Sequence, residues 1–407
     1  MRILLSAYAC EPNRGSEPGF GWNWAYYLAK GGNEVFLLTR VHAQEVIEKE
    51  LLNQHIPNLH IYYIDIPHWI KPFLVGKASI YFHYFIWQKQ AYLFSRQLIE
   101  RFDITHHVTW GSLHGGSELW KLAKPFIFGP IGGGQVAPKA FLKYFGKEQF
   151  WERLRTLFTH NITIFFPRVT KTISNSRLVL VSNNETLSLV KSMHAKHTRL
   201  FLDSGLPQDF IPRIRPLHEP DEKLKILWVG RVYPRKGLEL VFEVLQHVNI
   251  PFEFNIIGDG PWGYKIPIWI KSYNLNDKVH WFGSLDWNDL KKKYTNNDVF
   301  FFTSLRETFG SQFLEAMAYG LPIITLNQSG ARDFIPDDAG IKVDVSTPEE
   351  TSRLLAEAIE RLWYMPELRK QMGKVAYQFA KNQTWNNKVA DMENIYKGIL
   401  KNYIPLT

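Results

Sequence analysis

The sequence predicts an α/β protein made of two doubly wound, Rossmann-like domains that face each other across a cleft. Apolar runs of strand length alternate with helix-length segments through both halves of the chain, and a proline-rich stretch interrupts this alternation near the middle. Strands that alternate with helices favour a parallel sheet that is covered on both faces. The chain has 407 residues, of which 45% are hydrophobic, so it is long enough to bury two such cores.

The first domain is expected over residues 1–205. Its strands are expected at apolar runs that end in polar turns, at 3–9, 34–39, 61–64, 104–108, 126–128 and 178–182. Segments of helix length, such as 21–30 and 81–101, lie between these runs. The run at 3–9 follows a single basic residue, Arg2, and is short for the core of a signal peptide, so a buried first strand explains it better.

The second domain is expected over residues 206–385. Four prolines between 207 and 220 mark a linker at its start. Strands are then expected at 225–229, 252–257, 279–282, 299–302, 322–325 and 341–343. An amphipathic helical stretch closes the chain, and we expect its last part, 386–407, to pack back on the first domain. Because ligands of such sheets bind outside the carboxyl ends of the strands, the predicted site lies in the cleft between the domains.

The net charge of +9 and the pI near 9.3 favour an anionic partner, such as nucleic acid, a phosphorylated substrate or a membrane surface. Nucleic acid is the weakest of these because the basic residues fall outside any recognised nucleic-acid motif. The single cysteine, Cys10, excludes an intramolecular disulfide and favours a reducing compartment. No apolar run approaches the ~18 residues that span a bilayer. We therefore expect a cytoplasmic protein, with peripheral contact at the inner face of the membrane as an option.

One stretch, residues 139–177, combines basic and aromatic residues. Eight lysines and arginines stand there against two glutamates, and aromatic side chains are interleaved with them. Such a mixture suits contact with anionic lipid headgroups. It equally suits solvated helix faces over an aromatic core, and the sequence leaves both interpretations open.

Glu307 and Glu315 stand eight positions apart after the apolar run 299–302. Helical spacing of apolar residues follows, so Glu307 is expected in a turn at the carboxyl end of a strand and Glu315 in the next helix. Between them, Phe309 and Gly310 place backbone N–H groups at a helix N-terminus, which favours a phosphate. Two hydroxyl-accepting carboxylates around a phosphate site suit a nucleotide sugar, although two glutamates at this spacing are also common as solvated surface residues.

Arg231 and Lys236 follow the expected strand at 225–229. At the carboxyl end of a strand, two cations could neutralise a diphosphate leaving group, or they could be solvated turn residues. The loop 258–263 matches G-x-G-x-x-G, but Pro261 interrupts the helix that a dinucleotide-binding turn requires. We therefore interpret this loop as a wall of a nucleotide site.

The order of these motifs resembles one enzyme family. Gly-Arg-x4-Lys-Gly, Gly-Asp-Gly-Pro, Val-x-Trp-Phe-Gly, Asn-Asp-Val-Phe and Ser-Leu-Arg-Glu-Thr-Phe-Gly-x4-Glu-Ala-Met-Ala-x-Gly-x-Pro follow one another over about 220–345. This order resembles the retaining, nucleotide-sugar-dependent glycosyltransferases of the GT-B fold, the family four or glycosyl transferases group 1 type. The resemblance implies that Arg231 and Lys236 bind the donor diphosphate, that Glu307 holds sugar hydroxyls and that Glu315 binds the ribose. Further donor contacts are assigned to Gly15, Ser16, Gly260, Thr308, Phe309 and Gly310.

The first half matches the family less closely. Residues 13–21 look like its glycine-rich first loop, close to the donor phosphates and the acceptor, although three glycines also fit a plain tight turn. Glu17 in this loop and Gly133 in the run 129–135 are candidate acceptor or sugar contacts. Many family members carry a histidine near the second run that helps to position the donor sugar, and this chain has none there. Either glycine backbone groups hold the sugar, or a nearby histidine takes the role, with His107 as our candidate beside His106 and His114.

We expect the chain to transfer a sugar from a UDP- or GDP-type donor to a hydroxyl acceptor, with retention at the anomeric carbon. Arg231, Lys236 and Glu307 are the predicted catalytic residues, and no cofactor or metal is expected because no Asp-x-Asp motif is present. Glu307 would fix the sugar rather than act as nucleophile, and a donor phosphate oxygen would take the proton of the acceptor. The acceptor stays open, with a lipid-linked or polysaccharide precursor as options. The alternatives are a nucleotide-sugar epimerase of the same fold and a sugar-binding scaffold without turnover.

Overall fold

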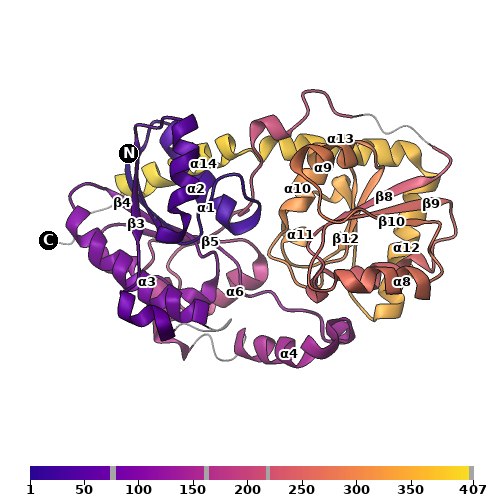
Figure 1. The fold of residues 1–407 in the computed structure, drawn as a ribbon, viewed down its shortest axis with the longest axis horizontal. Coiled ribbons are helices and arrows are strands. Elements are labelled where there is room, and N and C mark those ends of the chain that lie inside the picture. The colour runs from indigo at the N-terminus through magenta and orange to yellow at the C-terminus, as the bar shows by residue number, and fades with distance from the viewer. Residues whose placement is uncertain (74–78, 160–164, 217–220, 403–407) are drawn as a thin grey trace. The chain divides into compact units, whose positions relative to one another are not determined.

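The computed structural model describes residues 1–73, 79–159, 165–216 and 221–402, and it contains two compact units (Figure 1). The first unit consists of Met1–Gly134, Phe158–Gly205 and Trp385–Thr407. The second unit consists of Gln135–Leu157 and Leu206–Thr384. Each unit is therefore assembled from segments that lie far apart in the sequence.

In the described part of the first unit, seven parallel strands form one sheet in the order β3-β2-β1-β4-β5-β6-β7. Their bounds are β1 Arg2–Ala7, β2 Glu34–Arg40, β3 Leu59–Ile64, β4 Ile104–Thr109, β5 Phe126–Ile131, β6 Leu178–Val181 and β7 Thr198–Leu200. All six strands expected from the sequence are present, and β7 is an additional edge strand. The strand order reverses at β1, between β2 and β4, and ligands of open α/β sheets bind at such a switch point.

Helices cover both faces of this sheet, as a doubly wound fold requires. Among the described residues they are α1 Ser16–Lys30, α2 Gln44–Asn53, α3 Ser79–Ser95, α5 Pro167–Asn175, α6 Asn184–Ser192 and α14 Trp385–Lys401. Successive residues of a strand point to opposite faces. Ile3 and Leu5 of β1 join the core that α1 and α14 cover, whereas Leu4 joins the core that α3 and α5 cover. All three are fully buried, so β1 is covered on both sides.

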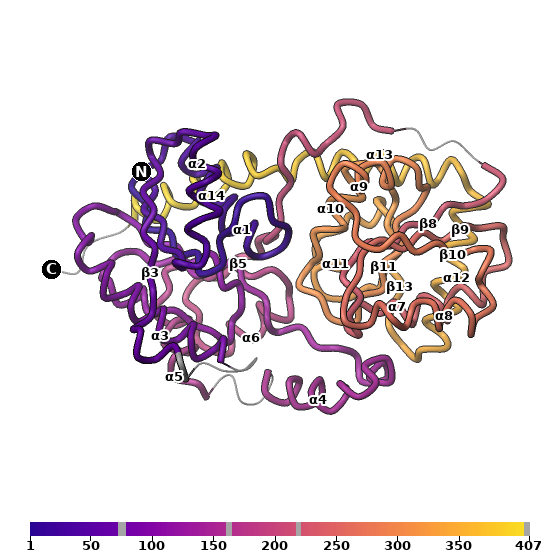
Figure 2. The backbone as a smooth tube through the Cα atoms, in the orientation of Figure 1, coloured from indigo at the N-terminus to yellow at the C-terminus, as the bar shows by residue number. Residues whose placement is uncertain are grey.

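The second unit repeats this plan with six parallel strands among its described residues, in the order β10-β9-β8-β11-β12-β13. Their bounds are β8 Leu224–Val229, β9 Phe252–Ile257, β10 Val279–Trp281, β11 Val299–Phe302, β12 Ile323–Leu326 and β13 Gly340–Val343. The helices are α7 Leu238–Leu245, α8 Ile266–Ser272, α9 Trp287–Thr295, α10 Ser311–Ala318, α11 Ser329–Phe334, α12 Pro348–Tyr364 and α13 Pro366–Asn382. In Figure 2, α7 lies near α8 and α12, against both of which it packs. Every strand expected from the sequence is again present.

The segment Gln135–Leu157 differs from its predicted place in a domain of residues 1–205, because its contacts put it in the second unit. It contains the 3-10 helix η6 (Lys139–Glu148) and the helix α4 (Gln149–Leu157). Tyr144 of η6 donates a hydrogen bond to Glu243 of α7, and Glu152 of α4 lies 2.7 Å from the Arg306 guanidinium. Polar contacts of this kind are made only once the chain has folded, so hydrophobic periodicity gives no sign of them.

The aromatic side chains of the stretch 139–177 differ in burial. Phe141, Tyr144 and Phe145 are at most 2% exposed and belong to a core. In contrast, Phe150 and Trp151 on α4 are each 67% exposed. Within the stretch, residues 160–164 lie outside the described residues. No helix in the described ranges is both long and apolar enough to cross a membrane.

Candidate functional site

The strongest cluster of charges in the second unit lies where β8 and β11 end. These strands pair in parallel, so their carboxyl ends lie at the same edge of the sheet. Lys236 ends the 3-10 helix η10 (Pro234–Lys236) that follows β8, and Glu307 lies in the turn after β11. Glu307 Oε2 accepts a hydrogen bond from Lys236 Nζ and another, of 3.0 Å, from Arg235 Nη1. The structure therefore joins Lys236 and Glu307, 71 positions apart in the sequence.

Burial makes this cluster electrostatically strong. The side chains of Lys236 and Glu307 are only 6% and 19% exposed. Burial raises the pKa of the Glu307 carboxyl, but the charges of Lys236 and Arg235 outweigh burial and lower that pKa to about 2. Glu307 is thus ionised at neutral pH and can accept hydrogen bonds but cannot donate one. No described residue donates to its second oxygen, Oε1, which is available to a hydroxyl group of a ligand.

Arg231 lies apart from this ion pair, in a cavity at the ends of β8 and β9. The cavity has a volume of about 470 Å³, and its lining includes Arg231, Gly258, Gly260 and Ser284. Arg231 is exposed, and its guanidinium lies 4.8 Å from the centre of the Tyr233 ring. A Cβ atom at Gly260 would lie 2.6 Å from the carbonyl oxygen of Val232, so glycine is needed for close approach of the two loops. The loop 258–263 is therefore a cavity wall.

The turn that follows Glu307 leads into α10, which begins at Ser311, and the predicted helix N-terminus beside Phe309 and Gly310 is thus present. Gly310 precedes it with a φ of +104°, a conformation that favours glycine. Thr308 Oγ1 accepts a hydrogen bond of 3.0 Å from Gln135 Nε2, and the Phe309 side chain is fully buried. Gln135 is a contact that the sequence did not indicate, because it comes from the segment that the prediction placed in the first domain.

Glu315 lies inside α10 and is 8% exposed. Its Oε2 atom accepts a hydrogen bond of 2.9 Å from Tyr294 Oη. Burial raises the pKa of the Glu315 carboxyl, and hydrogen bonds from Tyr294 and Ser311 partly oppose that rise. Tyr294 had not been predicted as part of the site, and no sequence signal pointed to it. Glu315 and Glu307 thus have different partners, a tyrosine hydroxyl and two cations.

In the first unit, the loops after β1 and β4 meet at the switch point of the sheet. Gly15 caps α1, and the exposed Ser16 has a φ of +62°. Glu17 Oε1 accepts a hydrogen bond from the backbone N–H of Gly111, which follows β4. Burial raises the pKa of the Glu17 carboxyl to about 7, against the opposing effects of the Gly111 hydrogen bond and the Arg40 charge. This carboxyl is therefore poised to exchange a proton near neutral pH.

The predicted sugar contact at His107 is not supported by its position. His107 is fully buried on β4, with Nε2 3.3 Å from the Trp110 carbonyl oxygen, and burial lowers its pKa to about 4. His106 is equally buried, and its ring nitrogens lie 2.6 Å from Tyr396 Oη and from the Gly129 carbonyl oxygen. Gly133 has a φ of +129°, and a Cβ atom there would lie 3.4 Å from His114 Nε2. Of the three histidines considered, His114 is the one beside the glycine run with exposed surface.

No group of three His, Cys, Asp or Glu side chains within the described ranges is arranged to hold a metal ion.

Comparison with known proteins finds a family match in the second unit. Residues 210–379 match the family model described as glycosyl transferases group 1. The phosphatidylinositol N-acetylglucosaminyltransferase GPI3 subunit of Saccharomyces cerevisiae is 24% identical over 225 residues, which are 51% of this chain and 50% of that protein. The chain thus spans about half the length of the curated relatives it matches.

Solved structures extend the similarity of fold over nearly the whole chain. Sucrose-phosphate synthase from Thermosynechococcus elongatus aligns with a TM-score of 0.70 at 18% identity, over 99% of this chain and 100% of that one. HepE from Anabaena, solved in complex with UDP-glucose, aligns with a TM-score of 0.59 at 13% identity, over 97% and 100% of the two chains. The two parallel-sheet units are those of the GT-B fold. Residues 210–379 of the chain thus match the glycosyl transferases group 1 family, and the fold of both units is that of solved glycosyltransferases.

Proposed function

We propose that the chain is a retaining glycosyltransferase that moves a sugar from a nucleotide diphosphate sugar to a hydroxyl acceptor. The observation that carries this proposal is the buried contact of Glu307 with Lys236 and Arg235 at the carboxyl ends of β8 and β11. A site with an ionised carboxylate next to a buried lysine and a partly exposed arginine can hold sugar hydroxyls and a diphosphate together. The family match over these residues supports the proposal, as does the UDP-glucose complex of the structurally similar HepE.

The main electrostatic task of the reaction is to stabilise the departing diphosphate. Glycosyl transfer passes through an oxocarbenium-like state in which negative charge grows on the leaving group. Lys236 and Arg231, with the backbone N–H groups at the start of α10, would stabilise that charge from fixed positions. In this proposal they do so without a metal ion. Because Glu307 is bound to cations, its role is to orient the sugar, and a phosphate oxygen of the donor takes the proton of the acceptor.

The first unit would supply the acceptor side. The Gly133 backbone lies at the carboxyl end of β5, where ligands of such sheets bind, whereas the Gly15–Ser16 turn after β1 stays a proposed donor contact. Glu17 is the residue of this unit best suited to a hydroxyl group, because its pKa near 7 lets it either accept or donate a hydrogen bond.

For the acceptor, we propose a lipid-linked or polysaccharide precursor. The name of the GPI3 relative refers to a phospholipid acceptor. On α4, the exposed side chains Phe150, Trp151, Leu154 and Leu157 recur at helical spacing and form an apolar stripe. Such a stripe next to exposed basic residues suits peripheral contact of a cytoplasmic protein with the anionic inner face of the membrane.

Incubation of the purified protein with isotopically labelled UDP- and GDP-sugars tests the proposal. A thermal-shift panel first selects the donor, because a ligand that binds only the native state raises its apparent stability. Transfer of label to an acceptor extract, with the anomeric configuration of the donor kept in the product, supports a retaining transferase. Conversion of the donor into an isomer would instead identify an epimerase, and binding without any product would identify a silent scaffold. Glu307→Gln is the variant that should abolish transfer.

A further inference from the structure

The first unit contains a cavity that the proposed donor site does not use. It has a volume of about 470 Å³ and lies at the carboxyl ends of β2 and β3, whose last residues, Arg40 and Ile64, pair with each other. Its lining includes Arg40, His42, Ile64, Asp65, Lys71 and His83. Basic residues and histidines therefore collect at the edge of the sheet where ligands of this fold class bind.

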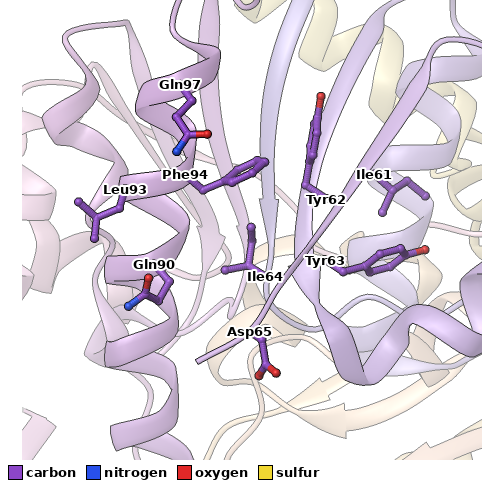
Figure 3. Close-up of a pocket in the computed structure, with 9 residues that line it drawn as sticks. All are labelled: Ile61, Tyr62, Tyr63, Ile64, Asp65, Gln90, Leu93, Phe94 and Gln97. Carbon is purple, nitrogen blue, oxygen red and sulfur yellow. The ribbon is translucent and has the colours of Figure 1, made fainter. Parts of the chain in front are cut away.

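A neighbouring hollow of about 520 Å³ differs from this cavity in the charge of the side chains that line it. It lies between β3 and the end of α3, and Figure 3 shows its side chains, with Gln97 at one end and Asp65 at the other. Asp65 is the charged residue among those that line it, and the rest are aliphatic, aromatic or amide side chains. Asp65 and Ile64 line both spaces, and the cations that line them, Arg40 and Lys71, belong to the Arg40 side of β3.

Arg40 is held in place by Tyr8 and forms no direct ion pair among the described residues. Its Nε atom donates a hydrogen bond of 2.8 Å to the Tyr8 carbonyl oxygen, and its guanidinium lies 4.3 Å from the centre of the Tyr8 ring. Arg40 lines the cavity beside the Tyr8 hydroxyl, and no salt bridge within 4 Å joins it to a carboxylate of the described residues. An arginine that is oriented but unpaired presents the planar donor arrangement that matches a phosphate.

The side chains of His83 and Lys71 are also held by neighbouring residues. Tyr8 is 3% exposed, and its hydroxyl lies 2.9 Å from His83 Nδ1, so one buried side chain contacts both Arg40 and His83. Lys71 Nζ lies 2.5 Å from Asp65 Oδ2, which balances the charge of that lysine. The cavity thus has a net positive charge from Arg40, together with lysine and imidazole donors. Such a prearranged set loses little freedom when a ligand binds.

We propose that this cavity binds a phosphate or diphosphate group carried by the acceptor. A guanidinium, an ammonium and two imidazoles offer more donors than the two oxygens of a carboxylate can use, whereas a phosphate has three or four oxygens. Exposed apolar side chains adjoin the donors along the chain: Trp69, 74% exposed, precedes Lys71 by two residues, and Phe82, 55% exposed, directly precedes His83. These side chains suit an apolar portion of the same acceptor. That the phosphate belongs to an acceptor rests on the proposed glycosyl transfer, whereas the anion site itself does not.

Ring NMR signals of histidine in the full chain test this site directly. The protein is labelled with ¹⁵N-histidine, the His42 and His83 signals are assigned from His42→Gln and His83→Gln, and inorganic pyrophosphate is titrated. Both signals should shift in a saturable way, and Arg40→Gln should weaken the apparent affinity at least tenfold, with Lys71→Gln as a second variant. Arg177→Gln is the matched control, because this exposed arginine precedes β6, which is separated from β2 by three strands of the same sheet. His280, exposed on β10 of the second unit, reports any binding there separately.

Two outcomes would overturn the proposal: unchanged His42 and His83 signals, or equal losses of affinity in Arg40→Gln and Arg177→Gln. Because these signals lie in the first unit, the result is independent of whether the donor assay succeeds. Vesicles identify the source of the phosphate. If phosphatidylcholine vesicles that contain phosphatidic acid sediment the wild type but not Arg40→Gln, the group is a lipid headgroup. If pyrophosphate binds but both proteins sediment alike, the phosphate belongs to a soluble acceptor.

Discussion

Lys236 and Arg231 differ in burial although both follow β8, and this difference decides how their removal should act. Arg231→Ala removes an exposed cation, so we expect turnover to fall roughly a hundredfold with little change in stability. Lys236→Ala also leaves the buried Glu307 carboxylate with one cation fewer, so both turnover and stability should fall. Initial rates and melting curves of both variants check this. Lys271→Ala, at an exposed lysine of α8, serves as control, and wild-type turnover in a folded Arg231→Ala protein would contradict the diphosphate role.

Glu315→Gln tests the proposed ribose contact. The substitution keeps the shape of the side chain but weakens a charge-assisted hydrogen bond, at a cost of ~1–3 kcal/mol per contact. Free UDP or GDP, whichever is the donor base, should bind about tenfold more weakly in calorimetry. Tyr294→Phe removes the hydrogen bond that Glu315 accepts in the structure while leaving its charge, so it separates nucleotide binding from packing. Equal nucleotide affinity in Glu315→Gln and the wild type would refute the ribose role.

The Glu307 carboxylate should make the free energy of unfolding depend on pH in the acid range. Its pKa is about 2 in the folded chain against an ordinary 4.5, so its contribution is fully present above the ordinary value and is lost as pH falls through 2. We expect the stability difference between the wild type and Glu307→Gln to narrow by about 2 kcal/mol from pH 7 to pH 3. Urea denaturation at several pH values measures it, with Glu148→Gln at an exposed site as control. A difference that stays constant with pH would mean that the ion pair contributes no net stability.

At the scale of single elements, the turn into α10 combines two requirements. It must hold Glu307 beside the cations and must start a helix within four residues. Gly310 satisfies both with its positive φ, and a Cβ atom there would lie 3.4 Å from Glu307 Cγ and 3.3 Å from Gln312 Oε1. The backbone conformation at this position therefore supports the geometry of the charge cluster.

Gly310→Ala should therefore weaken both the fold and donor binding. A strained backbone position of this kind costs on the order of 1–3 kcal/mol. Melting temperature and nucleotide-sugar affinity should fall together, because strain in the turn displaces Glu307. Gly398→Ala provides the contrast, since a Cβ atom there meets nothing within 4 Å and alanine favours its helix, α14. Normal donor binding in a folded Gly310→Ala protein would show that this turn does not position the site.

At the scale of the whole molecule, the proposed membrane contact depends on charge and on the apolar stripe of α4. Each exposed lysine or arginine near an anionic leaflet adds ~1 kcal/mol, and this attraction is screened over ~10 Å at 0.1 M salt. The protein should sediment with anionic vesicles at low salt and be released as salt rises. The double variant Phe150→Ser, Trp151→Ser should bind more weakly, whereas Tyr364→Ser, at a 69% exposed aromatic residue of α12, should not. Equal recovery in the supernatant with anionic and neutral vesicles would favour a soluble acceptor.

The fold class could be predicted from the sequence because the pattern that indicates it, an apolar run for each buried strand, is local and repeated. Each strand of a doubly wound sheet is buried on both faces, so it appears as an unbroken apolar run, and the expected runs at 3–9 and 225–229 are β1 and β8. β7 was missed because its three residues lie at the sheet edge and are only partly buried, so no apolar run marks them.

The sequence by itself indicated the two-sheet architecture through its alternating apolar runs, and it indicated the family that residues 210–379 match through short motifs in a set order. It could not show which groups meet. The partners of Glu307 and Glu315, the packing of Gln135–Leu157 on the second unit and the burial of His107 all depend on contacts between distant segments. Tertiary structure decided these, because the free energy of a buried charge or polar group depends on which neighbours folding places around it, and residue spacing along the chain does not contain that information.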